Sequence, residues 1–311
     1  MLDDLSGGFI ENVPAGAAFV EGSINDVDLV NSLCKRKSFR YIYHLAAYAA
    51  EGLSHYIKRF NYSNNLIGSV NLINAAINGG AECFVFSSSI AVYGTGAALP
   101  MAENSAAEPE DPYGIAKLAV EQELRVCNRM FGMNYVIFRP HNVYGERQNI
   151  GDRYRNVVGI FMNQILQNRP MSIFGDGSQT RAFSYIADVA PVIAAAADTP
   201  EAYNQVFNIG ADKAYTVNEL ARAVAHAMAV APMVEYLPAR KEVLHAFSTH
   251  DKLQRVFGGR PLHDLDQGLS RMADWAKKHG ARSSRRFENI EIARNLPAAW
   301  QDQIVASVAG R

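Results

Sequence analysis

The sequence predicts an α/β protein in which a doubly wound parallel sheet is followed by a smaller second domain. Through roughly the first half of the chain, short β-rich runs alternate with amphipathic helical stretches, which is the pattern of parallel strands joined by crossover helices. After residue 142 this alternation fades into loops rich in Gly, Asn and Arg. We therefore expect one domain at residues 1–141 and another at residues 142–311. The boundary should be interleaved, because the apolar run 207–210 is predicted to be a strand that returns to the first sheet.

The elements of the first domain follow from their apolar patterns. A helix is predicted from about residue 62 to residue 78, where apolar side chains recur at helical spacing, and Gly79 and Gly80 end it. A second helical segment is predicted near residues 217–230. The expected strands are the β-rich runs 19–22, 40–47, 83–86 and 135–138.

Polar side chains follow two of these strands at the point where each strand ends. Ser87, Ser88 and Ser89 come directly after one run, and residues 139–142 follow another. In an open α/β sheet, ligands bind beyond the carboxyl ends of the strands. Both polar segments are therefore predicted to lie at a binding site.

Composition favours a soluble globular protein. A chain of 311 residues that is 49% hydrophobic can bury a large core, and a formal net charge of -1 gives no electrostatic footprint for nucleic acid or an anionic membrane. The three cysteines are odd in number and far apart, which argues against disulfides, and the histidines lack metal-ligand spacing. No apolar run approaches the ~20 residues of a membrane helix. We expect a cytoplasmic protein with no metal, nucleic-acid partner or membrane partner.

One short segment carries the chemistry of a proton-transfer site. Asp111 and Pro112 are an N-cap and a first-turn proline, and the helix that they begin carries Tyr113 and Lys117 one turn apart on the same face. A nearby ammonium favours the phenolate of a tyrosine, whose ordinary pKa is near 10. Ser89 at the preceding strand end could hydrogen-bond the same substrate oxygen. Tyr113, Lys117 and Ser89 are therefore the predicted catalytic residues.

The first residues of the chain resemble the end of a nucleotide-binding strand and its loop. An acid that holds the adenosine ribose lies roughly 20 residues after a glycine-rich turn in such proteins, and here only two residues precede Asp3. The first strand, glycine turn and helix are thus expected to be absent from the chain as written. That loss would remove backbone amides from the pyrophosphate, so we expect weak NAD binding and poor solubility.

Together these motifs resemble the extended short-chain dehydrogenase/reductase family, and within it the UDP-sugar 4-epimerases typified by UDP-glucose 4-epimerase. The resemblance covers nearly the whole chain and implies a Rossmann-like fold with NAD as cofactor. Ser23 replaces an acid, and His141 stands where relatives often carry Phe beside the nicotinamide. The implied NAD-binding residues are Asp3, Asp4, Leu5, Ser6, Gly7, Gly8, Ser23, Ile24, Leu45, Ala46, Ala47, Asn65, Ser87, Tyr113, Lys117 and His141.

The resemblance also implies a nucleotide-sugar site. Arg181 and Arg240 match the family's diphosphate-binding arginines, whose guanidinium groups suit phosphate. Phe247 matches a position whose bulk limits the sugar, which favours UDP-glucose and UDP-galactose. The implied substrate-binding residues are Ser89, Asn142, Asn156, Val157, Ser172, Phe174, Arg181, Arg240 and Phe247.

The expected reaction is reversible oxidation at C4 of the sugar rather than elimination of water. Related 4,6-dehydratases carry Thr-Asp-Glu where this chain has Ser89, Ile90 and Ala91. In the implied mechanism Tyr113 takes the proton of the 4-hydroxyl, Lys117 binds the nicotinamide ribose, and Ser89 orders the proton path.

Two alternatives remain open at this point. The chain could be another nucleotide-sugar epimerase of the same superfamily, acting on a uronate, a pentose or an N-acetylhexosamine. It could also be a truncated, catalytically silent chain. The resemblance implies a homodimer through a four-helix interface formed by helices near residues 62–78 and 113–131, and a place in galactose metabolism. The sequence assigns no role beyond packing to residues 287–300.

Overall fold

The fold is described from a computed structural model that covers residues 1–259, 262–283, 287 and 289–303. Its central feature is a parallel sheet with the strand order β10 (Gln205–Ile209), β5 (Asn134–Pro140), β4 (Cys83–Ser87) and β3 (Tyr41–His44). The central strands β4 and β5 are almost entirely buried. Strands covered on both faces are typical of parallel sheets, so the predicted α/β class is confirmed.

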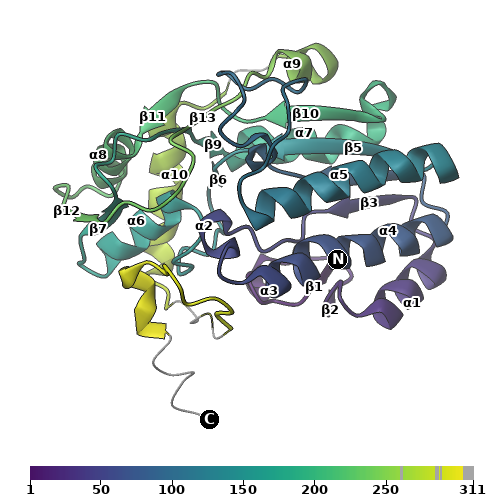
Figure 1. Cartoon of the computed structure of the whole chain (residues 1–311), viewed down its shortest axis with the longest axis horizontal. Coiled ribbons are helices and arrows are strands. Elements are labelled where there is room, and N and C mark those ends of the chain that lie inside the picture. The colour runs from purple at the N-terminus through teal and green to yellow at the C-terminus, as the bar shows by residue number, and fades with distance from the viewer. Residues whose placement is uncertain (260–261, 284–286, 288, 304–311) are drawn as a thin grey trace, which may run out of the picture.

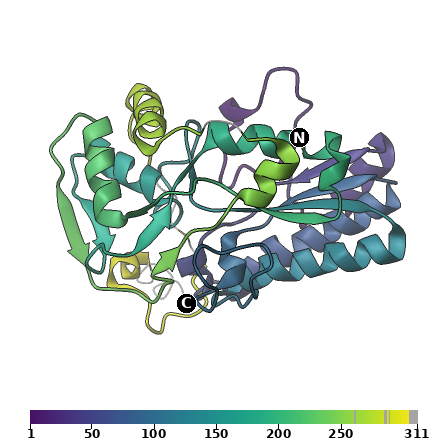
Figure 2. The ribbon, with the colours of Figure 1, turned by 90° about the horizontal axis from the view of Figure 1, so that it is seen from above.

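Helices cover both faces of this sheet (Figures 1 and 2). On one face α1 (Val27–Lys37), α4 (Gly68–Asn78) and α5 (Pro112–Phe131) share a core with Phe84 and Phe86. On the other face α7 (Ile186–Ala195) and α9 (Asp251–Phe257) share a core with strand residues such as Phe138. This arrangement is the doubly wound architecture that the alternating pattern predicts.

The first strands form a separate small sheet. β1 (Leu2–Asp3) and β2 (Val20–Glu21) pair in parallel with each other, and neither pairs with β3. Leu45, which follows β3, is 58% exposed. Among the described residues β3 therefore has β4 as its one strand neighbour.

The helix expected from residue 62 to residue 78 is interrupted. A short helix, α3 (Lys58–Tyr62), runs into a π-helical turn, η2 (Ser63–Ile67), before α4 begins. The buried Asn65 amide donates to Asn61 Oδ1 (2.8 Å) and to Tyr48 O (3.0 Å), and its carbonyl accepts from Tyr48 N (2.8 Å). Such π-turns are frequent at functional sites, and this one supports the chain segment that follows β3.

A second core lies between α6 (Val157–Leu166), α8 (Val217–Ala227) and α10 (Leu265–His279). α8 begins at a capping box formed by Thr216 and Glu219 and ends three residues before the predicted position. β10 comes from this half of the chain but pairs with β5, as its apolar run predicts. The 141/142 boundary itself stays a prediction.

The remaining elements are short. They comprise α2 (Glu51–Ser54), β6 (Val143–Tyr144), β7 (Met171–Phe174), β8 (Thr180–Ala182), β9 (Ser184–Tyr185), β11 (Ala214–Thr216), β12 (Val234–Leu237), β13 (His245–Ala246), and the 3-10 turns η1 (Ile10–Asn12), η3 (Ile90–Tyr93), η4 (Ala196–Asp198), η5 (Pro200–Ala202) and η6 (Ala298–Gln303). Within the described part of the chain, no helix combines the length and apolar character needed to cross a membrane.

Candidate active site

A cleft of about 1340 Å³ opens at the carboxyl ends of β3, β4 and β5. Both halves of the chain supply its walls, with Ser87 and Tyr113 from the first half and Asn142, Phe174 and Arg240 from the second. Its volume exceeds the ~300–1,000 Å³ of a typical small-molecule pocket. The cleft therefore has room for a dinucleotide and a second ligand together, at the position where α/β sheets bind them.

The start of α5 places two of the predicted catalytic side chains in this cleft. The Asp111 carboxylate accepts a hydrogen bond from Gly114 N at 2.9 Å, and Pro112 occupies the first turn, so the helix begins where the sequence predicts. Tyr113 and Lys117 both line the cleft, and they are only 6% and 2% exposed. The first turns of α5 thus contribute two buried side chains to the cleft.

Gly114 allows α5 to approach the turn that carries Ser89. A Cβ atom at this position would lie 2.6 Å from the backbone oxygen of Ala91, which real Cβ atoms essentially never do. The Ser89 side chain caps η3 by accepting a hydrogen bond from Ala91 N at 3.1 Å, and it lies close enough to Tyr113 to lower the pKa of that phenol. The absence of a side chain at residue 114 therefore brings Ser89 and Tyr113 together.

Lys117 is a buried ammonium with a polar partner. Its Nζ donates to Ser87 O at 2.7 Å and lies 4.7 Å from the centre of the Phe86 ring and 5.7 Å from that of Tyr113. Burial lowers the pKa of Lys117 to about 7, although the nearby carboxylate of Glu121 acts in the opposite direction. Since an ammonium has three donors, this group can also serve a ribose hydroxyl.

The pKa of Tyr113 differs from the sequence-based expectation. We expected a neighbouring ammonium to favour the phenolate, but burial raises the pKa of Tyr113, the charge of Glu51 raises it further, and the hydrogen bond with Ser89 opposes both. In the protein chain alone the phenol is thus the favoured form. The reason is that desolvation outweighs the polar neighbours.

A buried ion pair joins β5 to the middle of α5, beside the end of β4. Arg139 donates to both carboxylate oxygens of Glu121, at 2.9 Å and 2.6 Å, and Ser88 Oγ donates to the same carboxylate at 2.6 Å. The Arg139 guanidinium also lies 4.7 Å from the centre of the Tyr93 ring. Paired, charge-assisted hydrogen bonds of this kind hold both side chains in one geometry, although Arg139 Nη1 has no hydrogen-bond partner among the described residues.

The predicted NAD-binding residues divide into two groups. Leu45, Ala47, Ser87, Tyr113 and Lys117 line the cleft, and their chemistry fits the nicotinamide half of NAD. The Asp3 carboxylate stands at the end of β1, where it accepts a hydrogen bond from Leu5 N at 2.8 Å. The predicted residues outside the lining are Asp3, Asp4, Leu5, Ser6, Gly7, Gly8, Ser23, Ile24, Ala46, Asn65 and His141.

His141, which we expected beside the nicotinamide, is not among the residues that line the cleft. Its ring is 2% exposed, with Nδ1 3.1 Å from Ala182 O and Nε2 3.2 Å from His250 Nε2. His250 in turn lies 2.6 Å from a carboxylate oxygen of Asp212. An imidazole ring has two nitrogens that form hydrogen bonds, whereas a Phe ring has none. The His141 side chain therefore belongs to a buried polar network.

On the substrate side, every predicted residue but one lines the cleft. Phe247 is the exception; from the segment that precedes β13, the residues that line the cleft include Glu242 and Val243. Arg181 donates to the carbonyl oxygens of Thr180 and Leu244, both at 2.8 Å. The residues that do line it are Ser89, Asn142, Asn156, Val157, Ser172, Phe174, Arg181 and Arg240.

Sequence reasoning missed several charged and aromatic residues of the cleft, chiefly Glu51, Arg155, Glu242 and Trp300. Glu51 follows the carboxyl end of β3, and that position was the signal that could have revealed it. Although water reaches its side chain through the cleft, burial among protein atoms and the charge of Asp111 raise the pKa of Glu51 to about 7.

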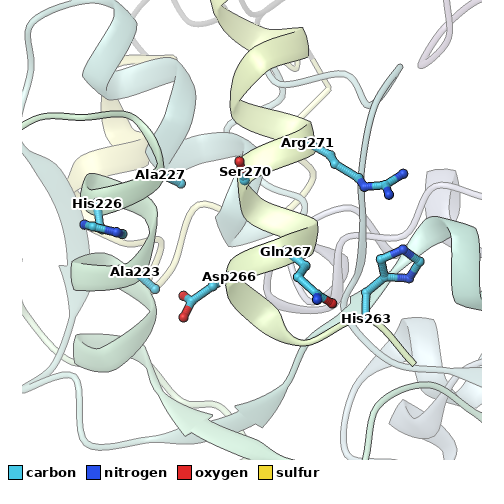
Figure 3. Close-up of a pocket in the computed structure, with 8 residues that line it drawn as sticks. All are labelled: Ala223, His226, Ala227, His263, Asp266, Gln267, Ser270 and Arg271. Carbon is cyan, nitrogen blue, oxygen red and sulfur yellow. The ribbon is translucent and has the colours of Figure 1, made fainter. Parts of the chain in front are cut away.

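A second pocket lies between α8 and α10 and contains none of the predicted site residues (Figure 3). Its lining includes His226, Asp266, Gln267 and Arg271. In the described part of the chain, no group of His, Cys, Asp and Glu side chains is arranged to hold a metal ion. The cleft at the strand ends is therefore the better candidate for the active site.

Comparison with known proteins agrees with this geometry. Residues 2–210 match the model of the NAD dependent epimerase/dehydratase family. A putative UDP-glucose 4-epimerase of Methanocaldococcus jannaschii is 32% identical over 90% of both chains. The crystal structure of UDP-glucose 4-epimerase from Thermotoga maritima with UDP-glucose has a TM-score of 0.85 at 32% identity, covering 89% of this chain and 90% of that one.

Related structures also include other substrates. UDP-N-acetylglucosamine 4-epimerase from Methanobrevibacter ruminantium, in complex with UDP-N-acetylmuramic acid, has a TM-score of 0.82 at 29% identity, covering 89% of this chain and 90% of that one. The similarities thus extend over most of each chain, while the sugar differs among the relatives. The chain belongs to the NAD dependent epimerase/dehydratase family, and NAD is its cofactor.

Proposed function

We propose that the protein catalyses the 4-epimerisation of a UDP-sugar, with UDP-glucose and UDP-galactose as the preferred pair. The observation that carries this proposal is the placement of Ser89, Tyr113 and Lys117 together in one cleft. Ile90 and Ala91, which occupy the places of the dehydratase acids, are not among the described residues that line it. The site thus favours reversible oxidation at C4 over elimination of water.

In this mechanism the chain's own residues position the sugar and move one proton. Ser89 hydrogen-bonds the 4-hydroxyl, and Tyr113 takes its proton at Oη while the C4–H bond breaks. This step needs the phenolate, which burial disfavours in the chain alone and which the positive charge of a bound nicotinamide ring would favour. When bound, NAD⁺ supplies a reversible acceptor for the hydride from C4. The 4-keto sugar then turns over, its C4 regains hydride on the opposite face, and Tyr113 returns the proton to the oxygen. Lys117, whose Nζ also donates to Ser87 O, would hold the nicotinamide ribose.

Cationic groups support a diphosphate on the substrate side. Arg181 and Arg240 line the same wall of the cleft, and Glu242 lies 3.8 Å from the first and 3.0 Å from the second. Guanidinium groups bind phosphate with paired hydrogen bonds. We therefore assign the UDP diphosphate to this wall, with Asn142 and Phe174 beside it.

A second substrate class deserves a test because of Phe247. That side chain was the reason to prefer hexoses without an N-acetyl group, and it does not line the cleft. UDP-N-acetylhexosamines and UDP-uronates are therefore alternative substrates.

We also propose a homodimer through α4 and α5. Exposed apolar side chains at one end of α5 support it: Val126, Met130 and Phe131.

The test is a substrate panel with purified protein and added NAD⁺. UDP-galactose should yield UDP-glucose, detected by anion-exchange chromatography, and Tyr113→Phe should abolish the conversion. Conversion of UDP-N-acetylglucosamine or UDP-glucuronate alone would move the assignment to the second class. No conversion of any member of the panel would refute the proposal and favour the catalytically silent alternative.

A further inference from the structure

The segment from residue 289 to residue 300, which we call the C-terminal strap, crosses back to the first half of the molecule. It lies beneath α6 and extends toward α3 (yellow in Figure 1). The Glu291 carboxylate accepts hydrogen bonds from Arg59 N at 2.9 Å and Phe60 N at 3.0 Å, and Glu291 N donates to Tyr56 O at 2.8 Å. Tyr56 OH donates to Asn295 O at 2.7 Å. The strap is therefore fixed to α3 by directional bonds.

The end of the strap fills the wall of the active-site cleft. Trp300 is 4% exposed, and its ring makes edge contacts with Tyr154 (5.3 Å between ring centres), Phe174 (6.1 Å) and Tyr56 (6.3 Å). Leu296 is buried in the same cluster, which also contains residues of α2 and α3. One indole thus contacts side chains from both halves of the chain.

Trp300 also supports Arg240. The Arg240 guanidinium lies 4.5 Å from the centre of the Phe174 ring and 5.9 Å from that of Trp300, and its Nη2 pairs with Glu242 at 3.0 Å. A Cβ atom added to Gly52 would lie 3.5 Å from Trp300 Cη2 and 3.6 Å from Arg240 Nη1. The two side chains therefore pack side by side against α2, and the indole limits where the guanidinium can go.

We propose that the C-terminal strap is a positioning device in which Trp300 holds Arg240 ready for the nucleotide diphosphate. The proposal rests on the proposed function, because Arg240 is assigned to the diphosphate there. A long cationic side chain that is already ordered loses less entropy when its ligand binds. Removing the indole should thus weaken binding of UDP and of the UDP-sugar by roughly three- to tenfold and leave the chemical step unchanged.

Steady-state kinetics test this role, because a purely structural role of Trp300 would not raise KM while leaving kcat unchanged. Trp300→Ala should raise KM for UDP-galactose by roughly three- to tenfold, with kcat within about twofold of the native enzyme. Trp300→Phe should restore most of the affinity. In an Arg240→Ala background the Trp300→Ala change should have no further effect on KM, because the group that it positions is gone.

Fluorescence provides a second test that does not need turnover. The chain has two tryptophans, and Trp275 lies on α10 with its ring stacked on His279. Trp275→Phe therefore leaves Trp300 as the single reporter, while Trp300→Phe is the matched control. Titration with UDP should shift the emission of the first variant and leave that of the second unchanged.

The outcomes separate this inference from the proposed function. If the emission of Trp300 responds to UDP but no UDP-sugar is epimerised, the positioning role of the C-terminal strap is supported and the proposed epimerase function is refuted. If epimerisation occurs while Trp300→Ala leaves KM and UDP affinity unchanged, the strap inference is overturned. It is also overturned if Trp300→Ala lowers kcat and thermal stability without raising KM, or if UDP does not bind.

Discussion

Replacement of Gly114 by alanine tests how closely α5 must approach the turn that carries Ser89. The added Cβ would lie 2.6 Å from Ala91 O and 2.9 Å from Pro109 Cβ. Ordinary contact begins at 3.4 Å, so α5 or the turn must move by about 0.8 Å. Overpacking of this kind costs about 1–3 kcal/mol of unfolding free energy, which the better helix propensity of alanine offsets in part.

Catalysis should suffer more than stability. A misplacement of about 1 Å at reacting groups can reduce the rate on the order of 10²-fold, and this movement separates Tyr113 from Ser89. We expect kcat for conversion of UDP-galactose to UDP-glucose to fall by that order, while urea unfolding shows a loss of no more than about 3 kcal/mol. The rate is measured by chromatography of the two nucleotide sugars.

Gly259 provides the matched control, because an added Cβ there meets no atom of the described residues, apart from its chain neighbours, within 4 Å. Gly259→Ala should leave both kcat and stability close to those of the native protein. If Gly114→Ala also keeps kcat within about twofold of the native value, then the close approach of α5 does not set the geometry of Ser89 and Tyr113, and this reasoning is wrong.

Two further predictions concern buried charges. Glu121→Gln should lower the free energy of unfolding, measured in urea, by about 3–5 kcal/mol, because it leaves the charge of Arg139 buried without its full partner. The control is Glu82→Gln at the exposed pair with Arg40, which should lower it by less than about 1 kcal/mol. Equal losses in the two variants would contradict this explanation. Lys117 has a pKa near 7 when folded against an ordinary value of 10.5, so between these values the unfolded chain binds more protons and stability should rise with pH. Above the ordinary cysteine pKa of 9.0, buried thiols such as Cys83, whose pKa burial raises to about 12, act in the opposite direction, so the window is pH 7 to 9. Urea unfolding of Lys117→Met should lack this rise; an undiminished slope would exclude Lys117 as its source.

Local signals in the sequence were sufficient to predict where α5 begins and that Tyr113 and Lys117 share one of its faces. Asp111 and Pro112 determine where α5 begins, and the spacing of Tyr113 and Lys117 then determines which face they share. Both signals act within two helical turns. They depend little on the rest of the fold, and for that reason the structure places both side chains in the cleft.

The features that sequence reasoning missed depend on distant contacts. Phe247 directly follows β13, and the pairing of β13 with β8 joins residues more than 60 positions apart, for example Ala246 and Arg181. Trp300 contacts Tyr154 and Tyr56, which lie still farther from it in the sequence. The break at Ser63–Ile67 likewise follows from the buried Asn65 network rather than from any breaker residue.

The pairing of β10 with β5 has a consequence for synthesis on the ribosome. The first sheet gains its outer strand only after residue 209 has been translated, more than 60 residues after β5 emerges. Until then, one side of β5 offers unpaired backbone groups, which invite association with other chains. The first 141 residues expressed alone would keep that open side permanently, so the nascent chain must delay completion of its first sheet until much of the second half has been made.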